Sequence, residues 1–474
     1  MRVPLTLGAY ATKSLIASAQ RSVNLFAEQN PKDAPTPFTY YPTAGLTLVS
    51  TPPVAGESRG IYTSSTGKRY EVVGANVYYV DSSNAYTLLG TINSLSGPVS
   101  MIDNTFHVFI VDGSPSGFTI ELSTNQFAPC VDPAFYGADK VDYVDGYFVF
   151  NKPGTQQFYI SRYADITFDP LDIASKSTYP DNLVTHAVMH REIWLFGELT
   201  TEVWFNTGQS DFTFGRMSGI FIEHGCAAKH SVAKIDLALF WLGKDLQGQG
   251  VVFVGQNYTA DRISTHALEQ ELRGYPTISD AIGFSYMQGG HAFYVLTFPT
   301  AGKTWCFDVT TAQWGERAFR KPEGTLTRHR MNCHSFNNGR NLVGDWETGA
   351  VYELDPDAYT DNGQPIERIR SFPHILGSDG NRVLFRQFIA DMQVGAGMPA
   401  DDEDPLVFLR WSDDRGASWG NRVAASMGRR GQFLTSIQFQ RLGYARDRVF
   451  ELSWSAPVAT ALNGAWIDVS RART

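Results

Sequence analysis

Paired hydrophobic strands recur along most of the chain, and they constrain its fold more than any other feature. Each unit has a strand of alternating apolar residues, a turn that contains Gly or Asn, and a second strand rich in aromatic residues. This pattern is typical of β-hairpins. The units are RYEVVGANVYYVD (69–81), VSMIDNTFHVFIVDG (99–113), VDYVDGYFVFN (141–151), AVMHREIWLFGELTTEVWFNTG (187–208), SVAKIDLALFWLG (231–243), AFYVLTFPTAGKTWCFD (292–308) and NLVGDWETGAVYELD (341–355).

The spacing of these hairpins predicts a β-propeller. The centres of the second strands are taken as Tyr78, Phe109, Phe148, Trp194, Phe240, Tyr294 and Val343. They are separated by 31, 39, 46, 46, 54 and 49 residues, close to the period of roughly 40–50 residues for propeller blades. One hairpin cannot bury its apolar face alone, whereas a ring of blades can. We therefore predict an all-β fold with a propeller of six or seven blades over residues 56–365.

Three segments depart from this rhythm. ISTHALEQELRGY (263–275) places its apolar residues on one helical face and ends at a glycine, which predicts a short helix between blades. Longer alternating strands after residue 365 predict a C-terminal β-sandwich over residues 366–474, joined by the turn-rich linker 355–367. Residues 1–55 lack hairpin units and form an N-terminal arm.

The composition supports this fold and excludes several functions. The chain has 43 Gly, 23 Pro and, as Phe, Tyr and Trp, 31, 21 and 10 aromatic residues, which suits many short strands joined by tight turns. A net charge of −9 disfavours a DNA clamp, which needs basic side chains to displace counterions. The four cysteines form no CxxC pair, so neither a zinc site nor a disulfide framework is indicated. The first residues are too weakly apolar for a signal peptide, and no stretch approaches the roughly 20 apolar residues of a membrane span.

One motif has a recognisable geometry. SDDRGASW (412–419) fits the Asp-box pattern S-x-D-x-G-x-x-W, with Ser412, Asp414, Gly416 and Trp419 in place. We expect Asp414 to accept backbone N–H groups across a tight turn, Gly416 to supply a positive φ, and Trp419 to fill the base of the hairpin. Sialidase propellers carry such boxes, but a single box outside the propeller region favours a structural turn over a glycosidase.

Other polar residues could form a catalytic or metal-binding site only if the fold brings their side chains together. Glu198 with Glu202, or Asp142 with Asp145, could supply the two carboxylates of a glycosidase, although turn positions favour solvated acids. His186 and His190 would share a metal only on a helix, and the adjacent Cys333 and His334 point to opposite sides of a strand. DDEDP (401–405) indicates a solvated loop rather than a Ca²⁺ site, and Arg429 with Arg430 an interface loop rather than a phosphate site. The sequence therefore predicts no catalytic residues, no metal and no cofactor.

Several segments together resemble one protein family. They are SVNLFAEQN (22–30), YYPTAGL (40–46), GPVSMIDN (97–104), VDGYFVFNKPGTQQFYIS (144–161), PDNLVTHAVMHREIWLFGELTTEVWFNTG (180–208), GCAAKHSVAKIDLALFWLGKD (225–245), YVLTFPTAGKTW (294–305), LRWSDDRGASW (409–419) and RLGYARDRVFEL (441–452). In their order, these resemble the tail hub or nozzle proteins of short-tailed bacteriophages, often called packaged-DNA stabilisation proteins.

The resemblance implies both a path for the arm and a function. The arm is expected to run as extended chain beside the C-terminal domain, with VNLF as a strand, PTAGL as the turn into the first blade, and Asn24 and Glu28 capping or pairing exposed backbone. The implied function is a homo-hexameric ring of the virion tail, below an adaptor ring and above a needle or plug, near tail spikes or fibres. It would close the DNA exit after packaging and form part of the ejection conduit, through which DNA passes without specific binding. A glycan-binding or glycan-cleaving propeller is the alternative.

Overall fold

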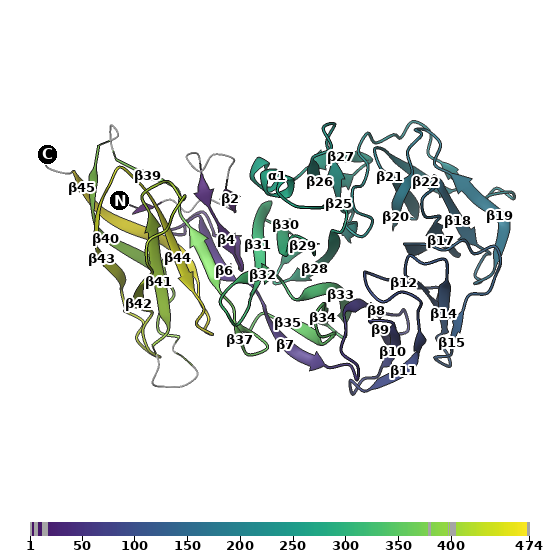
Figure 1. The fold of residues 1–474 in the computed structure, drawn as a ribbon, viewed down its shortest axis with the longest axis horizontal. Helices are drawn as coiled ribbons and strands as arrows, with labels where there is room; N and C mark the ends of the chain where they lie inside the picture. The colour runs from purple at the N-terminus through teal and green to yellow at the C-terminus, as the bar shows by residue number, and fades with distance from the viewer. Residues whose placement is uncertain are drawn as a thin grey trace.

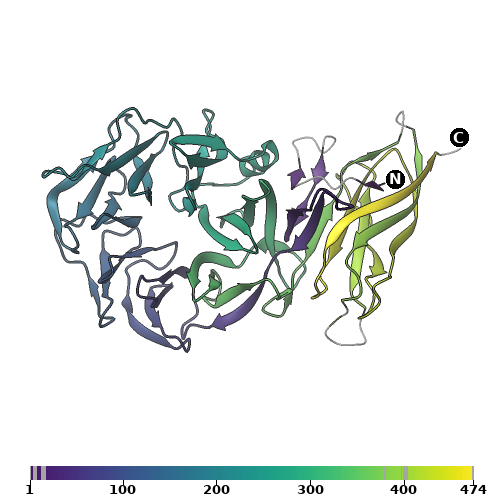
Figure 2. The same ribbon diagram turned by 180° about the vertical axis from the view of Figure 1, so that it is seen from behind.

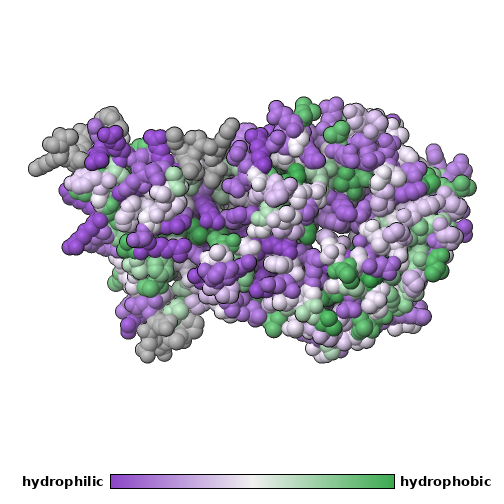
Figure 3. All heavy atoms as spheres, in the orientation of Figure 1, coloured by the Kyte–Doolittle hydropathy of each residue, from purple (hydrophilic) through white to green (hydrophobic). Residues whose placement is uncertain are grey.

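The molecule consists of a ring of sheets at one end and a β-sandwich at the other, as a computed structural model shows (Figure 1). The structure describes residues 2–3, 8–11, 18–377, 381–396, 398 and 404–471. The N-terminal segment runs between the two modules, and the C-terminus lies at the far end of the sandwich, as the view from behind also shows (Figure 2). Polar and apolar residues are interspersed over the displayed face of both modules (Figure 3).

The ring is a propeller, and within the described residues it has seven four-stranded antiparallel blades. Blades one to three contain β8 (Ser58–Thr63), β9 (Arg69–Val73), β10 (Asn76–Val80) and β11 (Tyr86–Thr91); β12 (Ser100–Asp103), β13 (His107–Val111), β14 (Gly117–Glu121) and β15 (Phe127–Pro129); and β16 (Val141–Val144), β17 (Tyr147–Asn151), β18 (Gln157–Ser161) and β19 (Phe168–Ser175). The expected all-β propeller is confirmed, and its blade number is seven.

The remaining blades follow the same order. Blades four and five contain β20 (Leu183–Met189), β21 (Glu192–Gly197), β22 (Thr201–Asn206) and β23 (Phe214–Arg216); and β24 (Ala233–Ile235), β25 (Ala238–Lys244), β26 (Gly250–Gln256) and β27 (Thr259–Arg262). Blades six and seven contain β28 (Ile282–Gln288), β29 (His291–Phe298), β30 (Lys303–Asp308) and β31 (Gln313–Arg320); and β33 (Met331–Asn337), β34 (Arg340–Asp345), β35 (Val351–Asp355) and β7 (Gly45–Ser50). The short β32 (Leu326–Arg328) pairs with β31.

The seventh blade is closed by the N-terminal segment. Strand β7 pairs antiparallel with β35, with Ser50 opposite Val351 and Gly45 opposite Asp355. The segment PTAGL therefore leads into the outer strand of the last blade, and the expectation that it turns into the first blade is wrong. Strand β7 also precedes the expected propeller start at residue 56. Joining the two ends of the ring in one sheet removes two exposed strand edges.

The structure explains the uneven spacing of the hairpins. Tyr78 lies on β10, the third strand of its blade, whereas Phe109 lies on β13, the second strand of the next blade; this shift shortens the first interval. The long interval of 54 residues between Phe240 and Tyr294 contains helix α1 (His266–Arg273). The helix predicted over 263–275 is confirmed: Thr265 caps it by accepting from Leu268 N, and Gly274 ends it.

No described helix is long and apolar enough to cross a membrane.

Apolar side chains fill the spaces between successive blades. Between blades two and three, Phe109 contacts Phe148 and Phe150 at ring-centroid distances of 5.6 and 4.9 Å. Between blades four and five, Trp194 and Trp241 are fully buried in one cluster. Burying one large apolar side chain contributes roughly 1.5–3 kcal/mol, so the inter-blade layers dominate the stability of the ring.

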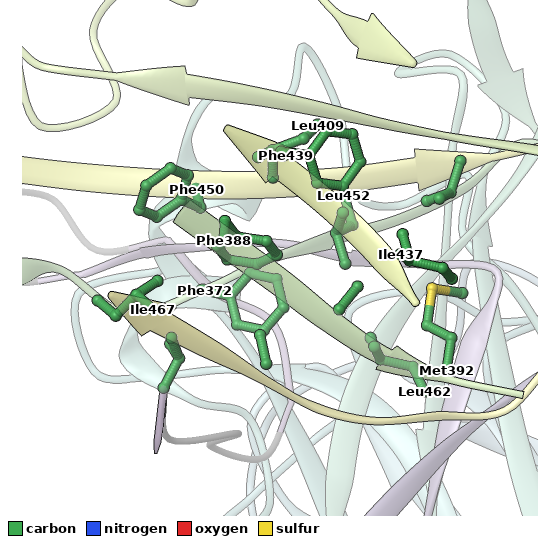
Figure 4. Close-up of a cluster of buried hydrophobic side chains, with 14 of the residues drawn as sticks. Phe372, Phe388, Met392, Leu409, Ile437, Phe439, Phe450, Leu452, Leu462 and Ile467 are labelled. Carbon is green, nitrogen blue, oxygen red and sulfur yellow. The ribbon is translucent and has the colours of Figure 1, made fainter. Parts of the chain in front are cut away.

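The C-terminal module is a sandwich of two sheets, as expected. One sheet has the order β43 (Ile437–Ala445), β40 (Val383–Met392), β45 (Leu462–Arg471), β6 (Phe38–Pro42), β5 (Leu25–Gln29), with β1 (Arg2–Val3) also on β45. The other contains β42 (Val423–Ser426), β41 (Leu406–Ser412), β44 (Asp447–Trp454), β38 (Arg368–Ser371) and β39 (Ile375–Leu376). Phe388, Phe439, Phe450 and Leu452 meet between the sheets (Figure 4). Two short pairs are β2 (Tyr10–Ala11) with β3 (Ala19–Gln20) and β36 (Thr360–Asp361) with β37 (Gln364–Pro365). Strand β4 (Ser22–Val23) lies between the two modules.

Candidate functional site

A two-residue strand of the arm joins the two modules into one sheet. Strand β4 (Ser22–Val23) lies between β31 of blade six and β38 of the sandwich. Val23 is opposite Glu316 on the parallel side and opposite Ile369 on the antiparallel side. The sheet is therefore continuous from blade six into the sandwich. We call this region, formed by β4 and the groups that hold it, the arm junction.

Asn24 fixes the arm immediately after β4. It is buried, and its φ of 54° lies in the left-handed region, where Asn is tolerated better than most residues. Its side-chain amide donates to Ala318 O and Glu367 O at 2.9 Å each, and its Oδ1 accepts from Ala318 N at 2.9 Å. Asn24 thus pairs backbone groups of blade six and of the segment entering the sandwich. Asn24 therefore pairs backbone as expected, but the groups that it pairs are buried and not exposed.

A buried carboxylate anchors the same strand to blade six. Glu316 accepts from Arg21 Nε and Nη2 at 3.1 and 3.0 Å, and from Lys303 Nζ at 2.7 Å. Burial alone would raise the pKa of Glu316, but Arg21 and Lys303 outweigh it and hold the pKa below its ordinary value. The charged pairs therefore hold the carboxylate ionised in a buried position, where losing either partner is costly.

A second buried arginine holds the arm on the sandwich side. Arg370 on β38 is fully buried and donates from Nη1 to Gly8 O at 2.7 Å and from Nη2 to Gln20 Oε1 at 3.2 Å. Its guanidinium lies 4.5 Å from the ring centroid of Tyr40, a cation–π distance. Burial lowers the pKa of Arg370. The arm thus supplies oxygen acceptors and an aromatic face to a cation of the sandwich.

The rest of the arm completes the core of the sandwich. Strands β5 and β6 form a hairpin at the edge of one sheet, and Leu25, Ala27 and Tyr40 belong to the buried cluster of the sandwich. The predicted strand VNLF is interrupted at Asn24, so that Val23 belongs to β4 and Leu25 to β5. Glu28 lies on β5 with an exposed side chain, and its expected capping function stays a prediction.

The residues of the Asp box form one turn after β41. Ser412 Oγ donates to Asp414 Oδ1 at 2.6 Å and accepts from Gly416 N at 2.7 Å. Asp414 Oδ1 also accepts from Ser418 N at 2.8 Å, and the bonds from Ser412 and Ser418 lower the pKa of Asp414 to about 2. Gly416 has a φ of 97°. Trp419 is half-buried, and its ring centroid lies 4.7 Å from the Arg410 guanidinium. Its expected packing at the base of the hairpin stays a prediction.

The candidate carboxylate pairs are engaged separately. Glu202 is buried and accepts from Thr178 N at 2.7 Å and Trp204 Nε1 at 3.0 Å, whereas Glu198 is exposed. Asp145 lies in a hairpin turn and pairs with Arg191 at 2.7 Å.

Asp142 faces a different neighbour, His186, at 3.6 Å between Oδ2 and Nε2. Among the described contacts, the members of each candidate pair therefore have different neighbours.

The two candidate metal ligands differ in burial, and the members of the candidate nucleophile–base pair contact different neighbours. His186 is buried on β20, while His190 lies in the following turn with a φ of 54° and is exposed. Cys333 Sγ lies 3.4 Å from Ser58 Oγ, and His334 Nε2 lies 3.0 Å from Asn341 Oδ1.

No group of three or more His, Cys, Asp or Glu side chains among the described residues could hold a metal ion. Of the acidic loop 401–405, residues 401–403 lie outside the described part; Asp404 pairs with Arg429 at 2.7 Å, and Arg430 is exposed.

Two family models cover both modules. Residues 1–359 match the model described as bacteriophage P22 Gp10, beta-propeller, and residues 368–470 match bacteriophage P22 Gp10, beta-sandwich. The chain belongs to the bacteriophage P22 Gp10 family. Members are structural proteins of the phage tail, so the chain is a component of the virion. The first model begins in the arm, in agreement with the placement of β7 inside the Gp10 propeller.

Three solved structures are similar to this chain at low sequence identity. BamB from Moraxella catarrhalis is 10% identical over 71% of this chain and 98% of its own, with a TM-score of 0.40. A chain of the mitotic checkpoint complex is 9% identical over 69% of this chain and 95% of its own, with a TM-score of 0.45. The WD40 β-propeller domain of Doa1 is 12% identical over 66% of this chain and 96% of its own, with a TM-score of 0.41. Such values carry no information on function, and the chain matches no curated protein.

Asn24 was predictable through the family resemblance, whereas the charged part of the arm junction was not. Arg21 and Glu316 are 295 positions apart in the chain, and no local pattern links them. The alternation in the segment 366–371 gave one usable signal. Arg368 and Arg370 occupy positions that point to the same side of a strand, and both side chains are fully buried.

Proposed function

We propose that the protein forms the hub or nozzle ring of a short phage tail, as a homo-hexamer that closes the DNA exit after packaging and becomes part of the ejection conduit. The proposal rests on membership of the Gp10 family and, within the chain, on the continuous sheet through β31, β4 and β38. A closure that resists the pressure of packaged DNA needs a rigid subunit. Backbone hydrogen bonds across the arm junction oppose hinge motion between the modules.

The charge of the chain also supports a conduit. The net charge of −9 is unfavourable for binding a polyanion, so DNA would pass a wall of such subunits without adhering. Residues 366–474 contain no Lys, and their 14 Arg exceed their 12 Asp and Glu. The opposite character of the two modules suits head-to-tail contacts between neighbouring copies, and cyclic symmetry requires such contacts to close.

The expected partners are the adaptor ring above, the needle or plug below, and the tail spikes or fibres at the rim. In this proposal the protein acts by assembly and not by catalysis. The separate engagement of the candidate carboxylates speaks against the glycan-cleaving alternative.

The test combines particle biology with oligomer analysis. Particles that lack the protein are expected to lose packaged DNA, measured as nuclease-sensitive DNA after packaging. Purified protein, alone or with its adaptor, is expected to give six-fold rings in negative stain. Retention of DNA by particles without the protein contradicts the proposal, as does release of oligosaccharides from host surface polysaccharide by the purified chain.

A further inference from the structure

A groove on blades four and five exposes apolar side chains that none of the functions above uses. Its volume is about 800 Å³, within the range of roughly 300–1,000 Å³ that is common for binding pockets. Tyr179, Leu199, Phe221 and Leu246 line it, and their exposure runs from 39% for Phe221 to 108% for Leu246. These residues come from four separate loops, so the fold gathers them in one place. We call this site the blade groove.

The floor of the blade groove is preformed and carries no charge. Val251 and Phe253 on β26 are buried beneath it. His224 stacks on Phe253 with a distance of 4.3 Å between ring centroids. Burial lowers the pKa of His224, although Glu223 acts in the opposite direction, so the imidazole is neutral at pH 7. Exposed apolar residues gathered over such a floor are typical of a surface that binds another protein.

Carboxylates outnumber cations around the blade groove. Its charged lining residues are Glu223, Asp245, Asp261, Lys244 and Arg262. The charge of Arg262 is compensated from outside the lining, because its Nε donates to Glu269 Oε1 at 2.6 Å. The groove therefore presents an excess of negative charge and is complementary to an apolar partner that carries cations.

The sandwich has a turn with this complementary character. Phe433 and Leu434, between β42 and β43, are 71% and 97% exposed. Arg429 and Arg430 precede them and are also exposed. Arg429 Nε donates to Asp404 Oδ1 at 2.7 Å, which leaves Arg430 as the excess charge of this group. The turn thus combines two adjacent apolar side chains with positive charge, in agreement with the interface loop that the sequence predicts here.

Hydrogen bonds hold this turn, residues 429–434, in a defined shape. Gln432 N donates to Arg429 O at 2.9 Å, and Gln432 Oε1 accepts from Arg429 N at 3.0 Å. Gly431 N donates to Gly395 O at 3.0 Å, which ties the turn to the segment after β40. A turn that is ordered before binding loses little conformational entropy when it binds. We call it the 429–434 turn.

The groove and the turn of one chain lie apart. Blade six and the arm separate blades four and five from the sandwich (Figure 1). The 429–434 turn can therefore meet a blade groove only on another copy. A contact between two different surfaces is heterologous, and contacts of this kind close a cyclic ring.

We propose that the 429–434 turn of one copy docks in the blade groove of the next copy around the ring. Phe433 and Leu434 enter the groove above Phe253, and Arg430 faces its carboxylates. The inference rests on the proposed homo-hexamer and names the contact that joins its subunits. In a closed ring each copy uses its groove once and its turn once, so every contact is supported by all the others.

Cross-linking tests this contact directly. Full-length Leu246→Cys and Leu434→Cys variants are mixed before ring assembly, with and without the adaptor, and treated with a short bismaleimide. Mass spectrometry is expected to find a cross-link between position 246 of one copy and position 434 of another. The wild type gives the background from the four native cysteines. Leu95→Cys, at a 76% exposed position of blade one, replaces Leu246→Cys as the matched control and should give no cross-link to position 434.

Substitutions in the groove provide a second measurement, the dissociation constant from sedimentation velocity. Leu246→Asp is expected to weaken association about thirtyfold, which corresponds to the loss of roughly 2 kcal/mol at an interface hot spot. Leu246→Met keeps an apolar side chain and should associate within a few-fold of the wild type. Leu95→Asp introduces the same charge outside the groove and is expected to leave association unchanged.

Charge reversal distinguishes docking from a local structural effect. Arg430→Glu and Glu223→Arg are each expected to weaken association about tenfold, because like charges then face each other. The two substitutions combined in one chain should restore affinity to within a few-fold of the wild type. Glu323→Arg, on an exposed turn after β31, is the control and should change nothing. Additive losses in the combined chain contradict the facing of these charges.

The outcomes separate this inference from the proposed function. Six-fold rings without the cross-link between positions 246 and 434 overturn the inference and leave the ring intact. The cross-link without six-fold rings supports the contact and contradicts the hexamer, and absence of both overturns both. Equal association of the wild type, Leu246→Asp and Arg430→Glu, all with the melting temperature of the wild type, also overturns the inference.

Discussion

The propeller and the sandwich differ in how far apart in sequence their pairing strands lie. In blades one to six, each strand pairs with the next strand along the chain, across turns of a few residues. In the sandwich, β45 pairs with β6, β38 pairs with β4, and partners come from opposite ends of the chain. Local pairing has a low loop-closure cost, whereas distant pairing has a higher one. The propeller is therefore built from local hairpins, and the sandwich depends on the arm.

The two modules also bury different groups. The propeller fills its inter-blade spaces with aromatic clusters such as Phe109, Phe148 and Phe150. The sandwich places three arginines, Arg368, Arg370 and Arg448, in fully buried positions, whereas the described part of the propeller has one, Arg59. Arg448 shows the pattern, because it donates to both carboxylate oxygens of Asp413 and stacks 4.6 Å from Phe385. Buried cations need partners fixed in space, so the sandwich tolerates less change in its neighbours.

Two N-terminal truncations of different length are expected to have the largest effect on the stability of the two modules. A chain that begins at residue 43 keeps β7 but loses β1 to β6. We expect its propeller to fold and its sandwich to open. A chain that begins at residue 52 also loses β7, and we expect the propeller to lose cooperative unfolding too. Limited proteolysis with mass spectrometry, together with thermal unfolding, distinguishes the two. A protease-resistant sandwich in either chain contradicts the dependence on the arm.

Asn24→Leu is expected to destabilise the protein by about 4 kcal/mol. Three hydrogen bonds are lost at roughly 1 kcal/mol each, and a branched residue at a left-handed φ costs about 1 kcal/mol more. Asn24→Gly should lose only the hydrogen bonds. Asn257→Leu, in an exposed hairpin turn with a φ of 51°, isolates the backbone strain. Urea denaturation measures all three, and a loss below about 1 kcal/mol for Asn24→Leu is incompatible with a bonding function of this residue.

Glu316→Gln is expected to cost about 3 kcal/mol at neutral pH, because Arg21 and Lys303 lose their shared carboxylate. The pKa of Glu316 is lower in the folded protein than its ordinary value of 4.5. Its stabilisation is therefore fully present above pH 4.5 and is lost as the pH falls through the depressed pKa. The difference between wild type and variant should shrink on acidification, as measured by urea unfolding at several pH values. Glu28→Gln, at an exposed position on β5, serves as the control; a difference that is constant with pH would falsify the assignment.

Two exposed turns are expected to show the smallest and most local effects. Asp81 Oδ1 closes a propeller turn by accepting from Ser83 N and Ala85 N at 2.8 and 2.9 Å, and Asp414 closes a sandwich turn in a similar way. Asp81→Ala should slightly increase hydrogen exchange in blade one alone, and Asp414→Ala should do so beside β41 alone. Spread of either effect across the arm junction would show that the modules are coupled even at their outer turns.

Most of the fold could be predicted from the sequence, because most of its elements are marked by local sequence patterns. Alternation and turn residues marked one hairpin in each of seven blades, the amphipathic segment with its terminal glycine marked α1, and the change of rhythm after residue 365 marked the sandwich. The blade number stayed open because Tyr78 belongs to a third strand and α1 lengthens one interval. Neither effect is visible without knowing which strands pair.

The arm junction was only partly predictable. The segment SVNLFAEQN was identified as strand-forming, and Asn24 as a residue that pairs backbone, through the family resemblance. The carboxylate of Glu316 and the guanidinium of Arg370 carried no signal, since their partners in the arm lie about 300 or more positions away.

The sequence by itself determined the hairpins, the short helix, the Asp-box turn and the division into two modules, because each depends on contacts within a few tens of residues. Only the tertiary structure decided that β7 closes the last blade and that β4 joins the propeller to the sandwich. These features depend on pairing between segments hundreds of positions apart, and local propensity does not choose among such pairings because closure of the whole ring selects them.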